Sequence, residues 1–178
     1  HDRCAGEEDG DGRRALRREP RRDALAERLG QTGREREFAH RQAAASLRDW
    51  MRAAGMTVGI DAVGNVTGHY PAENQAAKTL IVASHYDTVR NAGRYDGMLG
   101  VVAAIGCVHV LHQRGTRRPF ALEVVGFADE EGVRFGATLL GSRALAGTFD
   151  PKLLDSRDGA GTSMRDALTA FGLHPGNI

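Results

Sequence analysis

Some polar residues in this sequence have types and spacings suited to binding a metal ion or moving a proton. His85 and Asp87 are two residues apart, so on an extended backbone their side chains point the same way. An imidazole can bind a divalent metal, and a neighbouring carboxylate can orient or polarise that imidazole. Taken alone, the pair is more often a surface histidine beside an aspartate.

Two acidic groups follow along the chain. Asp96 lies between glycines at a loop-to-helix junction, where it could simply cap the helix. Glu130 and Glu131 follow Asp129, and adjacent glutamates suit metal chemistry, because one can bind the ion while its neighbour accepts a proton from water. A solvated acidic loop is the alternative reading of this run.

Two β-favouring runs lead directly into these groups. Residues 79–84 form a continuous run that ends at His85, as expected of a strand covered on both faces. Residues 120–127 form a second run that leads into Asp129. Open α/β sheets bind ligands at the carboxyl ends of their strands, so we expect the polar groups to meet at one sheet edge.

Helices and turns are expected around these strands. An amphipathic pattern predicts a helix from Phe38 to Ala54 that ends at Gly55, and an apolar helix between Gly97 and Arg114 should lie against the sheet. The other expected elements are strands at 56–60 and 62–66, with Gly64-Asn65 as a turn signal near the end of the second, a loop at 67–78, a helix at 137–146, a turn from Pro151, and a helix at 163–171 with Thr162 as N-cap.

The bulk properties indicate a globular protein of ordinary composition. Of its 178 residues, 41% are hydrophobic and 26% charged, and the net charge of +1 gives no broad field for nucleic acid or anionic lipid. No apolar stretch is long enough to span a membrane. Cys4 and Cys107 form no paired motif, which favours a reducing compartment. We therefore expect a soluble cytoplasmic protein whose partners are small molecules, without nucleic-acid or membrane partners.

The composition divides the chain into two parts. Residues 1–37 are rich in arginine, with acidic residues interspersed and few apolar side chains beyond a possible short helix at 15–29, so we expect them to be disordered or loosely docked. Residues 38–178 should form the folded domain. The chain begins with His1 and not with Met, which suggests a fragment, a processed product or a trimmed chain.

Longer strings around the polar groups resemble a known family. They are S-H-Y-D-T-V-R-N-A-G-R-Y-D-G-M-L-G-V at 84–101, V-V-G-F-A-D-E-E-G-V-R-F-G at 124–136 and G-S-R-A-L-A-G at 141–147, and the segments L-R-D-W-M-R-A-A-G-M-T-V at 47–58 and D-A-V-G-N-V-T-G at 61–68 also match. Together they resemble the allantoate amidohydrolase and N-carbamoyl-L-amino-acid hydrolase family, which are dinuclear metallohydrolases related to aminoacylase and carboxypeptidase G. The resemblance extends over residues 38–178.

The resemblance implies a role for each polar residue. His85 would be a ligand of one metal ion, Asp96 the carboxylate that bridges two ions, and Glu131 a ligand of the second. Glu130 would be the general base, and Asp87 would orient His85. The implied cofactors are two divalent ions, Zn²⁺ or Mn²⁺, with a water between them.

The fold and reaction follow from the same resemblance. It implies an α/β fold, a three-layer sandwich of the zinc-aminopeptidase type, and hydrolysis of a linear ureide. Allantoate, giving ureidoglycine, ammonia and carbon dioxide, is favoured because the R-N-A-G-R-Y-D-G string at 90–97 is closer to allantoate amidohydrolases. The alternatives are an N-carbamoyl-L-amino-acid hydrolase or a β-ureidopropionase. Full-length members of the family are expected to be homodimers.

The sequence departs from the family pattern in what it contains. The E-x-H-I-E-Q-G-P motif with a further ligand, a fifth ligand and the lid and dimerisation domain are not among these 178 residues, and His174 reads as loop. The resemblance thus covers the N-terminal portion of the catalytic domain only. We expect an open, weak metal site with little or no activity by itself, and an inactive truncated remnant is the alternative.

Other polar residues are expected to have structural roles. His109 and His112 lie on the apolar helix, and Cys107 should fill its core side. Arg134 and Arg143 could hold anions but suit salt bridges equally well. His40 and His69 have no evident partner in the sequence.

Overall fold

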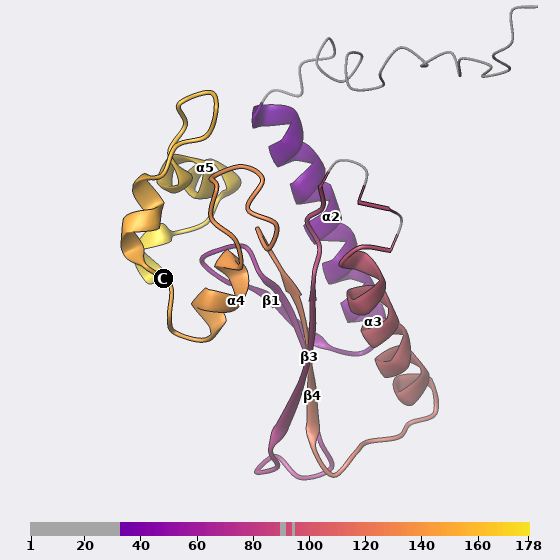
Figure 1. The fold of residues 1–178 in the computed structure, drawn as a ribbon. Coiled ribbons are helices and arrows are strands. Elements are labelled where there is room, and N and C mark those ends of the chain that lie inside the picture. Colours follow the sequence, from indigo (N-terminus) through magenta and orange to yellow (C-terminus); the bar gives the residue numbers. More distant parts are fainter. Residues whose placement is uncertain (1–32, 90–91, 94) are drawn as a thin grey trace, which may run out of the picture. The chain divides into compact units, whose positions relative to one another are not determined.

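Four strands form one mixed sheet in the computed structural model, which describes residues 33–89, 92–93 and 95–178. The strands are β1 (Thr57–Ile60), β2 (Val66–Tyr70), β3 (Thr79–His85) and β4 (Ala121–Phe127), in the order β1-β2-β4-β3. Only β3 and β4 run parallel, with His85 paired to Phe127 (Figure 1). Their carboxyl ends therefore lie together at one end of the sheet, as the sequence predicted.

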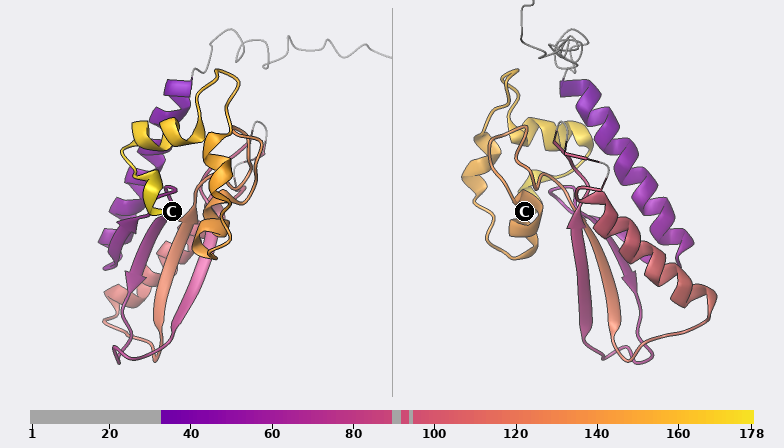
Figure 2. Two further views of the ribbon diagram at one scale, coloured as in Figure 1. Left: turned by 90° about the vertical axis from the view of Figure 1, so that its left-hand side faces the viewer. Right: turned by 45° about the vertical axis from the view of Figure 1, so that its right-hand side comes forward.

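Two helices cover one face of this sheet. α2 (Gly33–Ala53) packs on β1 and β2, and α3 (Met98–Gln113) packs on β3 and β4 (Figures 1 and 2). The main core lies between these helices and the sheet, because both helices turn an apolar stripe toward the strands. Its largest fully buried side chains are Tyr70, Leu47, Met51, Val66, Val101, Val108 and Val124.

The chain after β4 forms a smaller cluster beside the polar end of the sheet, and its last α-helix contacts α2 through Phe171 and His40 (Figure 2). It contains α4 (Leu140–Leu145), the 3-10 helix η1 (Pro151–Asp155), α5 (Met164–Phe171) and the 3-10 helix η2 (Pro175–Asn177). Leu140, Leu154 and Met164 form its buried centre. This cluster follows the polar end of β4 and so can support it.

The second strand lies four residues later than predicted. Residues 62–66 were expected as a strand, but the Asp61 carboxylate accepts hydrogen bonds from the N–H groups of Val63 and Asn65, which fixes a turn. β2 instead runs through Val66–Tyr70, most of which was expected as loop. Inward and outward side chains alternate along it, which is the pattern of a strand with one covered face.

Strand β3 differs from the expectation in its surroundings. It was predicted to be covered on both faces, yet it is the edge strand, and Leu80, Ile81 and Val82 are 50%, 49% and 39% exposed. In the described chain this continuous apolar run is therefore not covered on both faces.

Three smaller expectations are also corrected. The helix expected at 137–146 is confined to Leu140–Leu145, because Leu139 has a left-handed φ angle of 61°. Helix α5 is capped by Ser163 and not by Thr162, since the Ser163 hydroxyl accepts the Asp166 N–H. Cys107 is exposed on α3 and does not fill the core.

Two expectations concern the chain outside these elements. The short helix considered at 15–29 lies outside the described residues. Among the described residues, no helix has the length and apolar character needed to cross a membrane.

Candidate metal centre

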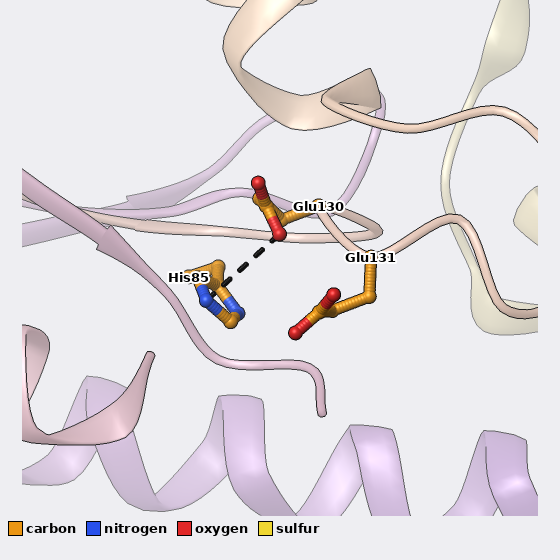
Figure 3. A group of neighbouring side chains, drawn as sticks. All are labelled: His85, Glu130 and Glu131. Atoms are coloured by element: carbon orange, nitrogen blue, oxygen red, sulfur yellow. Dashed lines mark ion pairs between the residues drawn. The ribbon is translucent and has the colours of Figure 1, made fainter. Parts of the chain in front are cut away.

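The ends of β3 and β4 bring three potential metal ligands together. His85 is the last residue of β3, and Glu130 and Glu131 follow β4 after two residues. One ligand atom from each of the three lies within 4.8 Å of the others. Figure 3 shows the His85 ring and both glutamate side chains turned toward a common space. The parallel pairing of the two strands is what creates this arrangement.

Asp96 also reaches this space, just before α3. Its Oδ1 lies 3.7 Å from His85 Nε2, and Glu130 Oε2 lies 3.9 Å from the same nitrogen (Figure 3 marks the second contact). The carboxyl groups of Asp96 and Glu131 share a hydrogen bond, which together with partial burial and the charges of Asp96 and Glu130 raises the pKa of Glu131. Carboxylates this close repel one another unless a proton or cation lies between them.

The orientation of the His85 ring leaves its Nε2 atom available to bind a metal ion. The Nδ1–H group donates to the backbone carbonyl of Asp87 at 3.0 Å, and the Asp87 carboxylate lies 3.5 Å from the same nitrogen. A neutral ring that donates through Nδ1 carries its lone pair on Nε2, the atom that faces Asp96 and Glu130. This is the tautomer that a metal ligand requires.

Asp87 also connects the two halves of the site. Its Oδ1 accepts the Glu130 N–H at 3.1 Å, and its Oδ2 accepts the Glu131 N–H at 3.1 Å. The hydrogen bonds of the Asp87 carboxylate are therefore directed at the backbone of the β4 loop, whereas the sequence indicated only the neighbouring His85. Such a bidentate contact fixes where both glutamates leave the main chain.

The start of α3 lies against the His85 ring because Gly97 has no side chain. A Cβ at Gly97 would lie 2.5 Å from two ring atoms of His85 and 2.6 Å from its carbonyl oxygen. The φ angle of Gly97 is 64°, which also disfavours other residues. This glycine allows Asp96, the residue before it, to approach the histidine.

Partly buried polar groups lie next to the ligands. Asp129 has a left-handed φ of 49°, and burial together with the Asp87 charge raises its pKa to about 6. The Tyr86 hydroxyl donates to the Gly64 carbonyl, and burial raises its pKa. Burial lowers the pKa of His40, whose ring stacks on Tyr86 at 4.5 Å between centroids. This partner of His40 was not evident from the sequence.

Asn65 is the main site-supporting residue that the sequence did not reveal. Its side chain is fully buried and accepts the N–H of Ala128, two residues before Glu130. Gly64-Asn65 was interpreted as a turn signal within a string that matches the family, and a contact over 63 residues of sequence leaves no local pattern. A buried asparagine must have such partners, but the sequence does not name them.

The remaining polar candidates have the surroundings expected of structural residues. Arg134 forms an ion pair with Asp158 at 3.0 Å, which agrees with the salt-bridge interpretation. His109 contacts Gln113 on α3, and the His112 ring meets Tyr70 edge-on. His69 lies 3.9 Å from Glu123 at the surface, away from the ligands.

The residues present fit a divalent cation. One imidazole nitrogen and several carboxylate oxygens are a donor set that Zn²⁺ and Mn²⁺ both accept. Asp96 and Glu130 raise the pKa of the Glu131 carboxyl, and a cation in the space between these groups would compensate their negative charge. The described site thus has the chemistry of a divalent metal centre.

Comparison with known proteins gives a family match over the same region. Residues 65–159 match the model of peptidase family M28, a span that includes both strand ends. This agrees with the resemblance noted in the sequence.

Curated relatives are amidohydrolases by name. The chain is 41% identical over 138 residues to an N-carbamoyl-L-amino acid amidohydrolase of Geobacillus stearothermophilus, covering 78% of this chain and 34% of that protein. It is 41% identical over 172 residues to a probable allantoate deiminase of Oryza sativa subsp. japonica, covering 89% of this chain and 34% of that protein. The chain spans about a third of the length of these relatives.

The fold has close counterparts among solved structures. A hydantoinase/carbamoylase family amidase from Burkholderia ambifaria superposes with a TM-score of 0.70 at 35% identity, over 74% of this chain and 32% of that one. The predicted fold class, an α/β sandwich represented by part of a metallohydrolase catalytic domain, is confirmed by this likeness.

Proposed function

We propose that this chain, which belongs to peptidase family M28, carries the metal-binding and proton-transferring side chains of an amidohydrolase that cleaves a linear ureide. The observation that carries this proposal is the grouping of His85, Glu130 and Glu131 at the carboxyl ends of β3 and β4. A sheet edge of this kind is where open α/β proteins bind their ligands.

His85 and Glu131 are proposed as ligands of two different ions, with Asp96 as the carboxylate between them. Two Zn²⁺ or two Mn²⁺ ions are the proposed cofactors. When bound, such ions polarise a carbonyl group and lower the pKa of water. The short distance from Asp96 to His85 and its hydrogen bond with Glu131 support a position between the two ligands.

Glu130 is proposed as the general base. Its carboxylate lies beside His85 and is partly open to solvent, so it can reach a water molecule in the site. It would take a proton from that water as the water attacks the carbonyl carbon of the ureide, and would return the proton to the leaving nitrogen. Asp87 holds the Glu130 backbone in place during both transfers.

Allantoate is the favoured substrate, with ureidoglycine, ammonia and carbon dioxide as products. The R-N-A-G-R-Y-D-G string at 90–97 supports this choice, and so does the likeness to a probable allantoate deiminase. An N-carbamoyl-L-amino acid is the second candidate, because the Geobacillus relative named for that substrate is equally similar. Homodimer formation and a cytoplasmic location remain predictions.

Metal binding is the direct test on this chain. Zn²⁺ or Mn²⁺ titrated into the metal-free protein in a calorimeter should give saturable binding, and chelator should reverse it. Binding no tighter than that of a His85→Ala, Glu131→Gln double variant contradicts the proposed centre.

Ammonia release tests the reaction. By itself the chain should have little or no activity, so ammonia release is sought with the chain in excess over allantoate or N-carbamoyl-L-amino acids and with Mn²⁺ or Zn²⁺ added. Any release should be greater from allantoate. Glu130→Gln should abolish the release while leaving metal binding in place. Release that does not depend on metal, or that is equal in Glu130→Gln, contradicts the role of Glu130.

A further inference from the structure

We infer that Asn65 is a positioning residue for the metal centre, through its hold on the start of the loop that carries Glu130 and Glu131. The inference rests on the proposed function for its metal, but the contacts that carry it belong to the chain alone. Asn65 touches no proposed ligand, and the family resemblance assigned it no role.

The Asn65 amide joins three parts of the chain. Its Oδ1 accepts the N–H of Ala128 at 3.0 Å, and its Nδ2 donates to the carbonyl of Gly141 at 2.9 Å and to Asp61 Oδ2 at 2.7 Å. The side chain is 0% exposed, so water cannot replace these bonds. Only this orientation of the amide places donor against acceptor at all three contacts.

Asp61 fixes the amide from behind. Its Oδ1 accepts the N–H groups of Val63 and Asn65, which shapes the turn between β1 and β2, while its Oδ2 accepts the Asn65 amide. The position of Asn65 is thus set by a charged acceptor within four residues, and it presents a rigid amide to the end of β4.

The loop after β4 is held against the segment that starts α4. The N–H of Gly141 donates to the Ala128 carbonyl at 3.1 Å, and the N–H of Leu139 donates to the Glu130 carbonyl at 2.8 Å. Asn65 adds one hydrogen bond to each segment: it accepts the N–H of Ala128 and donates to the carbonyl of Gly141. A Cβ at Gly141 would overlap Asn65 Oδ1 and lie 2.7 Å from the Ala128 carbonyl oxygen, so the packing has no spare room.

Both segments contain a residue in an uncommon backbone conformation. Asp129 has φ 49° and Leu139 has φ 61°, in the left-handed region that non-glycine residues seldom occupy. Such conformations persist only where surrounding contacts over-determine them. Asn65 supplies contacts on one side of the loop and Asp87 on the other. Without Asn65, we expect the loop to relax and its glutamates to turn away from His85.

Two readouts on the 178-residue chain test this role. The first is amide hydrogen exchange without metal, followed at residues 128–131 and 139–141. The second is the visible spectrum of bound Co²⁺, whose bands report the arrangement of the ligands. Asn65→Ala removes all three bonds, and Asp61→Asn is a milder variant that replaces the acceptor of the Asn65 amide. Asn177→Ala is the matched control, because Asn177 is exposed on η2.

Asn65→Ala should speed exchange at 128–131 by about tenfold or more and leave α2 and α3 unchanged. It should shift the Co²⁺ bands and weaken Co²⁺ binding by about 10- to 100-fold, the usual loss for a residue that supports a ligand. Asp61→Asn should produce smaller changes in the same directions, and should still do so if Asn65→Ala fails to fold. Asn177→Ala should match the original protein.

Each contrary result has its own meaning. A Co²⁺ spectrum unchanged in band positions, with binding unaltered in both variants, overturns the positioning role. Faster exchange throughout the domain with unshifted bands also overturns it, because Asn65 would then be a general stabiliser. If the unaltered chain gives no Co²⁺ bands, the metal centre itself is wrong, whereas bands present but insensitive to Asn65 remove only this inference.

Discussion

The two strands that carry the site differ in how firmly their ends are held. β4 is central in the sheet, and side-chain contacts from Asn65 and Asp87 fix the loop that follows it. β3 is the edge strand and has exposed apolar side chains, although it ends in the His85 ligand. In the proposed centre the β4 loop is therefore held by side chains on both of its sides, whereas β3 is held mainly by its pairing with β4.

This difference shows which half of the site has its side chains positioned more firmly. The glutamates of the β4 loop are placed by hydrogen bonds to backbone groups, which do not depend on what covers the sheet. His85 is placed by β3, and the stability of an edge strand depends on its single neighbour. We therefore expect changes at the two strands to have unequal consequences.

The largest effect should come from removing a ligand of either half. His85→Ala and Glu131→Gln should each weaken Zn²⁺ binding by more than about 100-fold, beyond the loss typical of supporting residues. Calorimetric titration measures this. His174→Ala, a change at an exposed histidine, should leave binding unaltered. A larger loss of Zn²⁺ affinity for one of the two variants would show that its half of the site contributes more to binding.

A somewhat smaller effect is expected where the halves are joined. Asp87→Asn keeps the shape of the side chain but cannot accept both the Glu130 and Glu131 N–H groups. We expect Zn²⁺ affinity to fall by about 10- to 100-fold. Asp49→Asn is the control, because Asp49 is exposed on α2 and pairs only locally with Arg52. Unchanged affinity would mean that the β4 loop holds its form without the β3 segment.

The strands themselves offer a matched pair of substitutions. Val82 of β3 and Val124 of β4 are direct partners in the parallel ladder, but Val82 is 39% exposed and Val124 only 1%. Val124→Ala should lower the free energy of unfolding by about 2.5 kcal/mol, the combined cost of lost burial and a cavity. Val82→Ala should lower it by less than about 1 kcal/mol. Urea unfolding compares them, and equal losses would contradict the contrast.

The smallest effect concerns pH and the buried Asp129. Its pKa is raised to about 6 in the folded protein, so folding favours the protonated form and stability from this group declines as pH rises through that value. Asp129→Asn removes the titration and tolerates the left-handed φ. Relative to the original chain, this variant should gain about 2 kcal/mol between about pH 4.5 and about pH 7. A pH-independent difference in urea unfolding would contradict the shift.

The sequence predicted the parts of this structure that rest on local patterns. Both site strands, α3 and the meeting of their polar ends followed from β-favouring runs and helical spacing, and His85, Glu130 and Glu131 are grouped as that placement required. The chemical roles of these residues came from the family resemblance and stay predictions.

Features set by distant contacts could not be read in this way. The turn that displaced β2 depends on one carboxylate, Asp61, that competes for backbone N–H groups. The exposure of β3 depends on its place in the sheet, which its own residues do not encode. The partners of Asn65 and His40 lie on other elements, so only the folded chain brings them together.

The glycine beside the His85 ring limits which substitutions the metal centre can tolerate. Gly97 donates nothing to a metal or a substrate, yet any side chain there would collide with the histidine and with its backbone. In a saturation screen scored on metal binding, Gly97 should reject replacements as completely as His85 does. His109, a residue of a metal-binding type, should accept many. The absence of a side chain at Gly97 should therefore be as strictly required for metal binding as the ligands are.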